Sequence, residues 1–316
     1  MIDKHFRAYT DLALEASEMV REKDDIEING VKVDIDETKD KDIKVTLVEI
    51  ETDEGSKIMQ KPKGKYISIE AECLKDSDIE KHSKVSKILA CNIEKLICDS
   101  NDKKDIKNVL VVGLGNSSVT ADSLGPNVAQ NIIVTRHLFS PSKIIKDKEI
   151  FGISSAIVPG VMGMTGMESS EIVKGVVDKI NPNIVIVIDS LAARNMNRIN
   201  TTIQLTDTGI YPGSGVGNTR KILNKDTLGK KVIAIGVPTV VNALTLVSDI
   251  CNLELKEQNN ALSDEEINEF MKYEKLCVTP KEEDIIIKRI SNVIIDGINM
   301  FIHEGLTQED IKNFLY

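Results

Sequence analysis

The sequence predicts a mixed α/β fold in which a mostly parallel sheet is sandwiched between helices. Two continuous apolar runs, at 108–113 and 184–189, have the composition of buried parallel strands. Helical patterns separate them from further strand-like runs, and strands that alternate with helices imply a sheet covered on both faces. Residues 26–72 add a separate N-terminal β region, because strand-like alternation and turn residues dominate there.

The chain is predicted to open with an amphipathic segment over 9–19 and then to enter the β region. Asn29-Gly30 between apolar runs is a strong signal for a two-residue hairpin. Apolar residues nearly alternate over 43–50 and continue in 66–70, as in a sheet with one wet face. Over 78–98 the apolar spacing is helical, which predicts a helix leading into the core.

The α/β core is predicted over 108–251. Its strands are expected at 108–113, 150–157, 184–189, 200–206 and 231–237, and its helices at 123–138, 168–180 and 239–251. The charged stretch 254–274 leaves the core, and a last helix is expected over 281–304. These parts together predict a single domain.

Composition and charge exclude several classes of function. The 316 residues carry a formal net charge of −10, whereas a general nucleic-acid-binding protein presents a basic face. No apolar stretch approaches the roughly 20 residues that cross a bilayer, and the first residues lack the apolar core of a secretory signal. The five cysteines are scattered without metal-binding spacing, which indicates reduced thiols in the cytoplasm. We expect no cofactor, no metal, no nucleic acid and no membrane partner.

Two aspartates follow the central apolar runs. Asp122 comes after the Gly113-Leu114-Gly115 turn that ends the first run, and Asp189 ends the second. In open α/β sheets the carboxyl ends of the strands form the crevice in which ligands bind. Two carboxylates there could share a proton and act on a water molecule. Each aspartate has an alternative interpretation as a helix N-cap, but the end of a buried strand favours a catalytic site.

Other motifs have less specific interpretations. The Gly113-Leu114-Gly115 turn opens a dinucleotide-binding fingerprint, but Ser118 stands where its third glycine belongs. Asp207-Thr208-Gly209 matches the signature of aspartic proteases that are nearly all β, and in this α/β chain we interpret it as a turn closing a strand. The glycine-rich loop 213–218 could cradle phosphate or shape a peptide cleft. The four histidines lie far from these loops in sequence, so no Ser-His-Asp site is predicted.

A set of sequence blocks along nearly the whole chain resembles the germination protease family of endospore-forming bacteria. These blocks are residues 9–16, 113–116, 122–126, 159–163, 189–194, 207–218 and 236–241. The chain departs from the family pattern in the loop before the first aspartate. Ser117 and Ala121 stand where the family has a Trp and a Pro, while Asp122 itself is kept.

The resemblance implies an atypical aspartic endopeptidase with a fold like that of hydrogenase-maturation endopeptidases. Its catalytic aspartates would be Asp122 and Asp189, and its substrates small acid-soluble spore proteins degraded during germination. The family is made in the developing spore as an inactive precursor and assembles as a homotetramer, so the location implied is the cytoplasm of the forespore, later the spore core. The segment 10–15 imitates the family's substrate pattern, so autocatalytic cleavage is expected between Asp11 and Leu12. That cut would divide the chain into a propeptide, 1–11, and a protease domain, 12–316.

Three alternatives remain open at this point. A hydrogenase-maturation endopeptidase would use acidic residues to bind nickel, although the long N-terminal β region argues against it. A nucleotide-binding α/β protein would use the strand–Gly-x-Gly–helix opening. A scaffold without catalytic activity would keep the fold and lose the chemistry.

Overall fold

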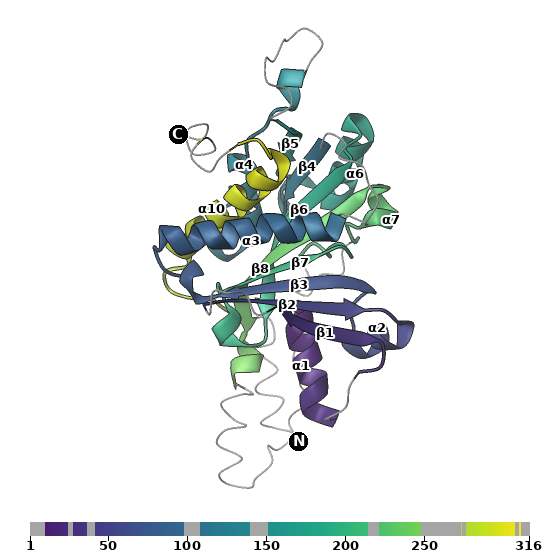
Figure 1. Cartoon of the computed structure of the whole chain (residues 1–316), viewed down its shortest axis with the longest axis vertical. Helices are drawn as coiled ribbons and strands as arrows, with labels where there is room; N and C mark the ends of the chain where they lie inside the picture. The colour runs from purple at the N-terminus through teal and green to yellow at the C-terminus, as the bar shows by residue number, and fades with distance from the viewer. Residues whose placement is uncertain are drawn as a thin grey trace.

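The structure is a computed structural model of the whole chain (Figure 1). It describes residues 10–24, 28–36, 42–97, 108–139, 151–213, 221–247, 273, 276–306 and 310. Of the predicted loop 213–218 only Gly213 is described, and of the charged stretch 254–274 only Tyr273.

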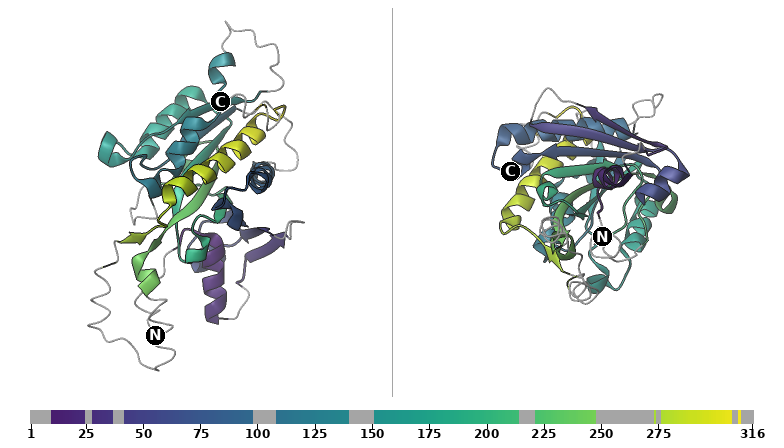
Figure 2. Two further views of the ribbon diagram at one scale, coloured as in Figure 1. Left: turned by 90° about the vertical axis from the view of Figure 1, so that its left-hand side faces the viewer. Right: turned by 90° about the horizontal axis from the view of Figure 1, so that it is seen from below.

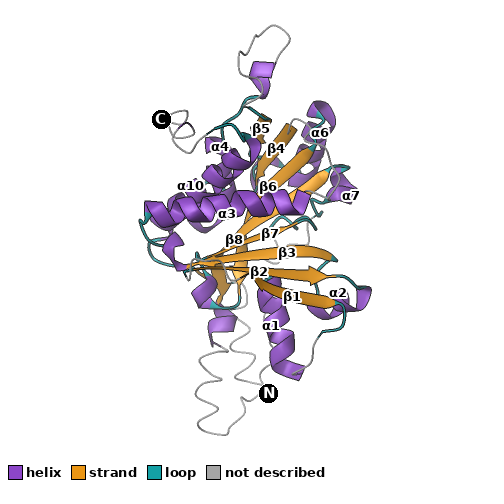
Figure 3. Cartoon of the chain, viewed as in Figure 1, coloured by secondary structure: helices purple, strands orange, loops and turns teal. Residues whose placement is uncertain are grey.

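One mixed sheet runs through the described part of the chain (Figure 3). Its strands lie side by side in the order β1 (Val31–Asp36), β2 (Ile43–Ile50), β3 (Gly64–Ala71), β7 (Thr202–Thr206), β8 (Lys231–Asn242), β6 (Ile184–Ala193), β4 (Asn108–Gly113) and β5 (Ile153–Ile157). The short strand β9 (Cys277–Val278) pairs with β8 off this path. The N-terminal β region and the core thus form a single hydrogen-bonded sheet, joined where β3 pairs with β7.

The predicted fold class, a mixed sheet flanked by helices, is confirmed, with a different balance of strand directions. Parallel pairing is confined to β5–β4–β6–β8. The strands β1, β2, β3 and β7 pair antiparallel, and so does β9 with β8, so antiparallel pairings outnumber parallel ones. Sequence alternation identifies a strand but carries no information on its direction.

Helices cover both faces of the sheet. One face is covered by α3 (Ile79–Ile97), α4 (Leu124–Asn131) and α10 (Glu283–Ile302), and the left view of Figure 2 shows α10 running along the strands. On the other face α6 (Ser169–Ile180) and α7 (Lys225–Leu228) pack over the core strands. The helix α1 (Ala13–Asp24) packs on β2 and β3, next to α2 (Asp53–Met59). Among the described residues no helix combines the length and apolarity that a membrane span requires.

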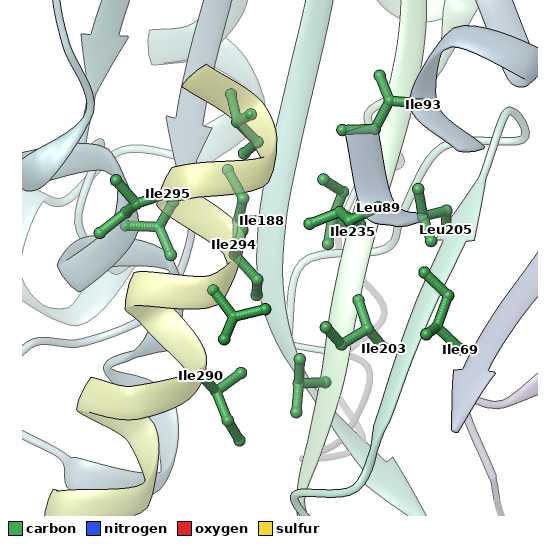
Figure 4. Packing of buried hydrophobic residues seen from close by; sticks show 14 of the residues in the cluster. Ile69, Leu89, Ile93, Ile188, Ile203, Leu205, Ile235, Ile290, Ile294 and Ile295 are labelled. Carbon is green, nitrogen blue, oxygen red and sulfur yellow. The ribbon is translucent and has the colours of Figure 1, made fainter. Parts of the chain in front are cut away.

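The two apolar layers follow from the alternation of side chains along β6. Ile186 and Ile188 point into the layer with α3 and α10, and Val185 and Val187 into the layer with α6. Figure 4 shows residues of the first layer, from α3, α10, β3, β6, β7 and β8. By the same alternation, Asp189 belongs to the face of Val185 and Val187.

Close packing of α3 on α10 depends on one glycine. A Cβ on Gly297 would lie 2.7 Å from Leu89 Cδ2, so the two helices approach over a position without a side chain. The predicted helices 78–98 and 281–304 correspond to α3 and α10 within two residues at each end.

Several predicted elements differ from the structure in their bounds or their pairing. The helix expected from 239 begins only at 243, because the β-branched residues Thr239, Val240 and Val241 extend β8 along β6. Asn29-Gly30 forms a turn with Gly30 at φ +78°, but the strand after it, β1, pairs with β2. The predicted hairpin partner 26–28 lies mostly outside the described residues.

One further short helix and four 3-10 turns belong to the described elements. They are α5 (Met162–Thr165), η2 (Glu72–Leu74), η3 (Thr120–Asp122), η4 (Arg136–Phe139) and η5 (Met196–Arg198). The predicted helix 123–138 is therefore split into α4 and η4.

Candidate active site

Asp189 lies inside the strand β6, which continues for four residues beyond it. Its neighbour on β8 is Gly236, and its side chain is only 2% exposed. One carboxylate oxygen accepts from the N–H of Ser190 at 2.9 Å, and the other lies 3.5 Å from the N–H of Gly213. Because no helix begins after Asp189, the N-cap interpretation of this residue is wrong.

Asp122 is held by a tight turn that leaves β4. Its backbone carbonyl accepts from the N–H of Asn116 at 3.0 Å. Gly115 makes the turn at φ +109°, and a Cβ there would lie 2.1 Å from the Asp122 carbonyl oxygen. The cap of α4 is Ser123 rather than Asp122, so the N-cap interpretation fails for this aspartate too. Neither aspartate therefore caps a helix.

A chain of hydrogen bonds fixes the Asp122 turn to β8 and to the start of α10. The hydroxyl of Thr239 donates to the carbonyl of Ala121 at 2.6 Å, and the hydroxyl of Thr279 donates to the carbonyl of Thr239 at 2.9 Å. We call these two bonds the clasp. Thr279 also hydrogen-bonds to Glu283, a buried carboxyl at the beginning of α10.

The two aspartates interact electrostatically. Burial raises the pKa of Asp189 well above its usual value, and the charge of Asp122 raises it further, against the two backbone N–H groups that lower it. Asp122 is only half-buried, so water reaches its side of the pair. The arrangement therefore favours the protonated form of Asp189.

Asp207 has a structural role in the described chain. Its carboxylate accepts from the N–H of Lys65 at 2.9 Å, at the end of the β3–β7 pairing. The hydroxyls of Thr206 and Thr208 bond to each other across it. Burial raises the pKa of Asp207, yet the residue serves to close a strand, in agreement with the turn interpretation.

The N-terminal segment lies against β6 just beyond Asp189. The N–H of Asp11 donates to the carbonyl of Ala192 at 3.0 Å, and the N–H of Ala192 donates to the Asp11 carboxylate at 2.9 Å. The carboxylate of Asp11 also raises the pKa of Asp189, so the two acids are close enough to interact. Leu12 is fully buried and packs in the same layer as Leu191.

A cavity of about 500 Å³ adjoins this segment. Its lining includes Thr10 and Asp11, and also Lys61, Gln204 and Gly236. Neither Asp122 nor Asp189 lines the cavity, but Gly236, the cross-strand neighbour of Asp189, does. The cavity is therefore adjacent to the aspartate pair rather than centred on it.

Sequence reasoning did not find two polar residues of this region, Lys61 and Gln204. Lys61 donates to the carbonyls of Thr10 and Asp11 at 3.0 and 3.1 Å. Gln204 Nε2 donates to the Asp11 carbonyl at 3.2 Å, and its Oε1 accepts from the N–H of Ala13 at 2.7 Å. A lysine in a polar turn and a glutamine within a strand carry no sequence signal of such contacts.

The described part of the chain holds no cluster of typical metal ligands. Within these residues no three His, Cys, Asp or Glu side chains gather closely enough to hold an ion. The methionines of the 159–167 loop are exposed on the surface at Met162, Met164 and Met167.

Comparisons with known proteins point to one family. The sequence profile of the germination protease family matches residues 10–272. Similar curated relatives, each named germination protease, come from Caldanaerobacter subterraneus subsp. tengcongensis (45% identical, covering 97% of this chain and 98% of the relative), Clostridium perfringens (41%; 98% and 99%) and Bacillus subtilis (38%; 95% and 95%).

Proposed function

The chain belongs to the germination protease family, and we propose that it is an aspartic-type endopeptidase whose proton-transferring pair is Asp122 and Asp189. Membership makes it a protease that acts in spore germination. The observation that carries the proposed mechanism is the buried Asp189, whose pKa is raised both by burial and by the charge of Asp122.

In this mechanism the two carboxyls share one proton, since two close carboxylates cannot both ionise easily. Asp189 is the protonated member and polarises the scissile carbonyl. Asp122, which is half-buried and open to water, acts as the general base. Asp189 then gives its proton to the leaving amine. The pair titrates as a unit, so its pH profile reports both groups together.

The proposed substrates are small acid-soluble spore proteins, and the proposed first substrate is the chain itself. Two observations support cleavage between Asp11 and Leu12. The segment has an acid before the bond and a large apolar residue and Ala after it, and it bonds to β6 at Ala192, three residues beyond Asp189. Because Leu12 is fully buried, a second molecule cannot reach this bond in the folded chain, so the cut is intramolecular. Mild acid favours it, because a proton must be loaded onto the pair.

The same proposal includes the cellular setting. The enzyme works without a cofactor, in the cytoplasm of the forespore and later in the spore core, as a homotetramer. Removal of the propeptide 1–11 converts an inactive precursor into the protease domain 12–316.

The test compares Asp122→Asn and Asp189→Asn with the control Asp207→Asn. Each of the first two is expected to abolish proteolysis while the far-ultraviolet circular dichroism stays unchanged, because a carboxamide cannot share the proton. Asn at 207 keeps an oxygen that can accept from the Lys65 N–H, so this variant retains activity. An inactive Asp207→Asn together with an active Asp122→Asn would move the site to the Asp-Thr-Gly turn.

A further inference from the structure

Each backbone polar group around the Asp11–Leu12 bond has a bonding partner in the described chain. The N–H of Asp11 bonds to β6, and its carbonyl accepts from both Lys61 and Gln204. The N–H of Leu12 donates to the Thr10 hydroxyl at 3.0 Å. The N–H of Ala13 donates to Gln204 Oε1, so the Gln204 amide bridges the two sides of the bond.

Two acidic side chains of the segment, Asp11 and Glu15, accept hydrogen bonds from backbone N–H groups. Ala192, three residues after Asp189, presents its N–H to the Asp11 carboxylate and its carbonyl to the Asp11 N–H. Further along, the carboxylate of Glu15 accepts from the N–H groups of Arg194 and Asn195 at 2.7 and 2.9 Å. Strand β6 and the residues after it therefore bind the acid before the bond, Asp11, and a second acid four residues after it, Glu15.

The sheet register brings these contacts toward the aspartate pair. Gln204, Gly236 and Asp189 are consecutive neighbours across β7, β8 and β6. Adjacent strands lie about 4.8 Å apart, so the Cα atoms of Gln204 and Asp189 are about 10 Å apart. Gly236 between them has no side chain, and the Leu191 side chain occupies the space above it, with Cδ1 2.4 Å from the place of a Cβ.

We infer that Lys61 and Gln204 form the site that binds the carbonyl oxygen of the residue before the cut bond, with Ala192 N–H binding that residue's carboxylate. The inference rests on the proposed function and adds the groups that hold the substrate. The segment 10–15 shows in cis how an acidic substrate segment binds.

The chemistry requires donors at this oxygen. Water adds to the carbonyl carbon and loses a proton to the aspartate pair, and negative charge gathers on the carbonyl oxygen. The C–N bond then breaks, and the pair returns a proton to the leaving nitrogen. An ammonium and an amide N–H that already point at the oxygen stabilise this charge without reorganising. Burial lowers the pKa of Lys61, while Asp11 and Glu15 oppose that effect and favour the ammonium.

The decisive variants are Lys61→Met and Gln204→Glu, with Lys63→Met as the matched control. Glu keeps the acceptor for the Ala13 N–H and loses the N–H donor. Lys63 is two residues away, is half-exposed and pairs with Asp53 on the surface. The full chain is used throughout. Two rates are measured: self-cleavage at Asp11–Leu12 by mass spectrometry, and kcat and KM on a peptide with the sequence of residues 5–19.

The expected result is a fall in kcat of about 10²-fold or more for each variant, because that is the cost of removing one donor from a developing oxyanion. KM is expected to change much less, Lys61→Arg to recover part of the rate, and Lys63→Met to match the unchanged protein. A raised KM with unchanged kcat would overturn the inference, since it would mean that the two residues only hold the segment. So would wild-type rates in both variants.

The inference can fail while the proposed function stands. If Asp122→Asn and Asp189→Asn are inactive and Lys61→Met is fully active, only the carbonyl site is wrong. If both aspartate variants still cut, the proposed function fails, whatever the lysine does. A wild-type chain that cuts neither itself nor the peptide overturns both.

Discussion

Replacing Glu283 with Gln is expected to change how the stability of the fold depends on pH. Glu283 lies at the start of α10, is 3% exposed and accepts from the Asn200 amide at 2.5 Å. Burial raises its pKa from 4.5 to about 7, although the interactions with Asn200 and Thr279 lower it in part. The native chain therefore binds a proton here over a pH range in which the unfolded chain has released it.

The sign follows from proton linkage. Between pH 4.5 and about 7 the native state holds more protons at this site than the unfolded state, so the free energy of unfolding falls as pH rises. The contribution is complete below pH 4.5 and is lost once pH has risen through 7. A pKa difference of this size corresponds to roughly 3 kcal/mol. Gln does not titrate, so the variant lacks this part of the pH dependence and gains on the wild type as pH rises.

The assay is urea unfolding of the wild type and Glu283→Gln at intervals from pH 4.5 to about 8. The exposed neighbour Glu282 supplies the control variant Glu282→Gln. The raised pKa of Asp189 acts in the same direction in all three proteins, so the difference between wild type and variant isolates Glu283. If the curves for wild type and Glu283→Gln run parallel across this range, the buried carboxyl is not protonated and the reasoning is wrong.

Three further outcomes are expected. Chelators, serine reagents and thiol reagents leave peptide cleavage largely unchanged; strong inhibition by a chelator that added nickel reverses would instead support a metal-dependent maturation endopeptidase. Sedimentation at micromolar concentration gives a species several times heavier than the 34.9 kDa chain, and a lone monomer would contradict the tetramer. Gly113→Ala places a Cβ 2.1 Å from the Gly125 carbonyl, so thermal unfolding is expected to show a loss of about 1–3 kcal/mol or more from overpacking, and an unchanged midpoint would show that β4 and α4 can separate.

Much of the core could be predicted because its signals are local. The apolar run 184–188 identifies a buried strand that carries Asp189, although β6 continues to Ala193, so Asp189 lies inside the strand rather than at its end as predicted. The run 108–113 corresponds to β4 residue for residue. The catalytic role of Asp122 and Asp189 stays a prediction, although the structure brings the two close enough to interact.

The contacts that could not be predicted join residues far apart in sequence. Lys61 and Asp11 are 50 residues apart, and Gln204 and Asp11 are 193 apart. Lys61 stands in a polar stretch with the composition of a solvated turn, and its contacts with the N-terminal segment depend on α2 packing beside α1. Such contacts are set by tertiary packing, which no local pattern encodes.

The clasp also determines when a newly made chain can complete the contacts that hold the Asp122 turn. A ribosome releases the chain from its N-terminus, so the Asp122 turn leaves the ribosome long before Thr279 does. Until Thr279 arrives, the second bond of the clasp is missing and α10 does not cover its face of the sheet. β3 must likewise wait for β7, which follows it by more than a hundred residues. The Asp122 turn and the sheet around it therefore gain their last contacts only when nearly all of the described chain has been made.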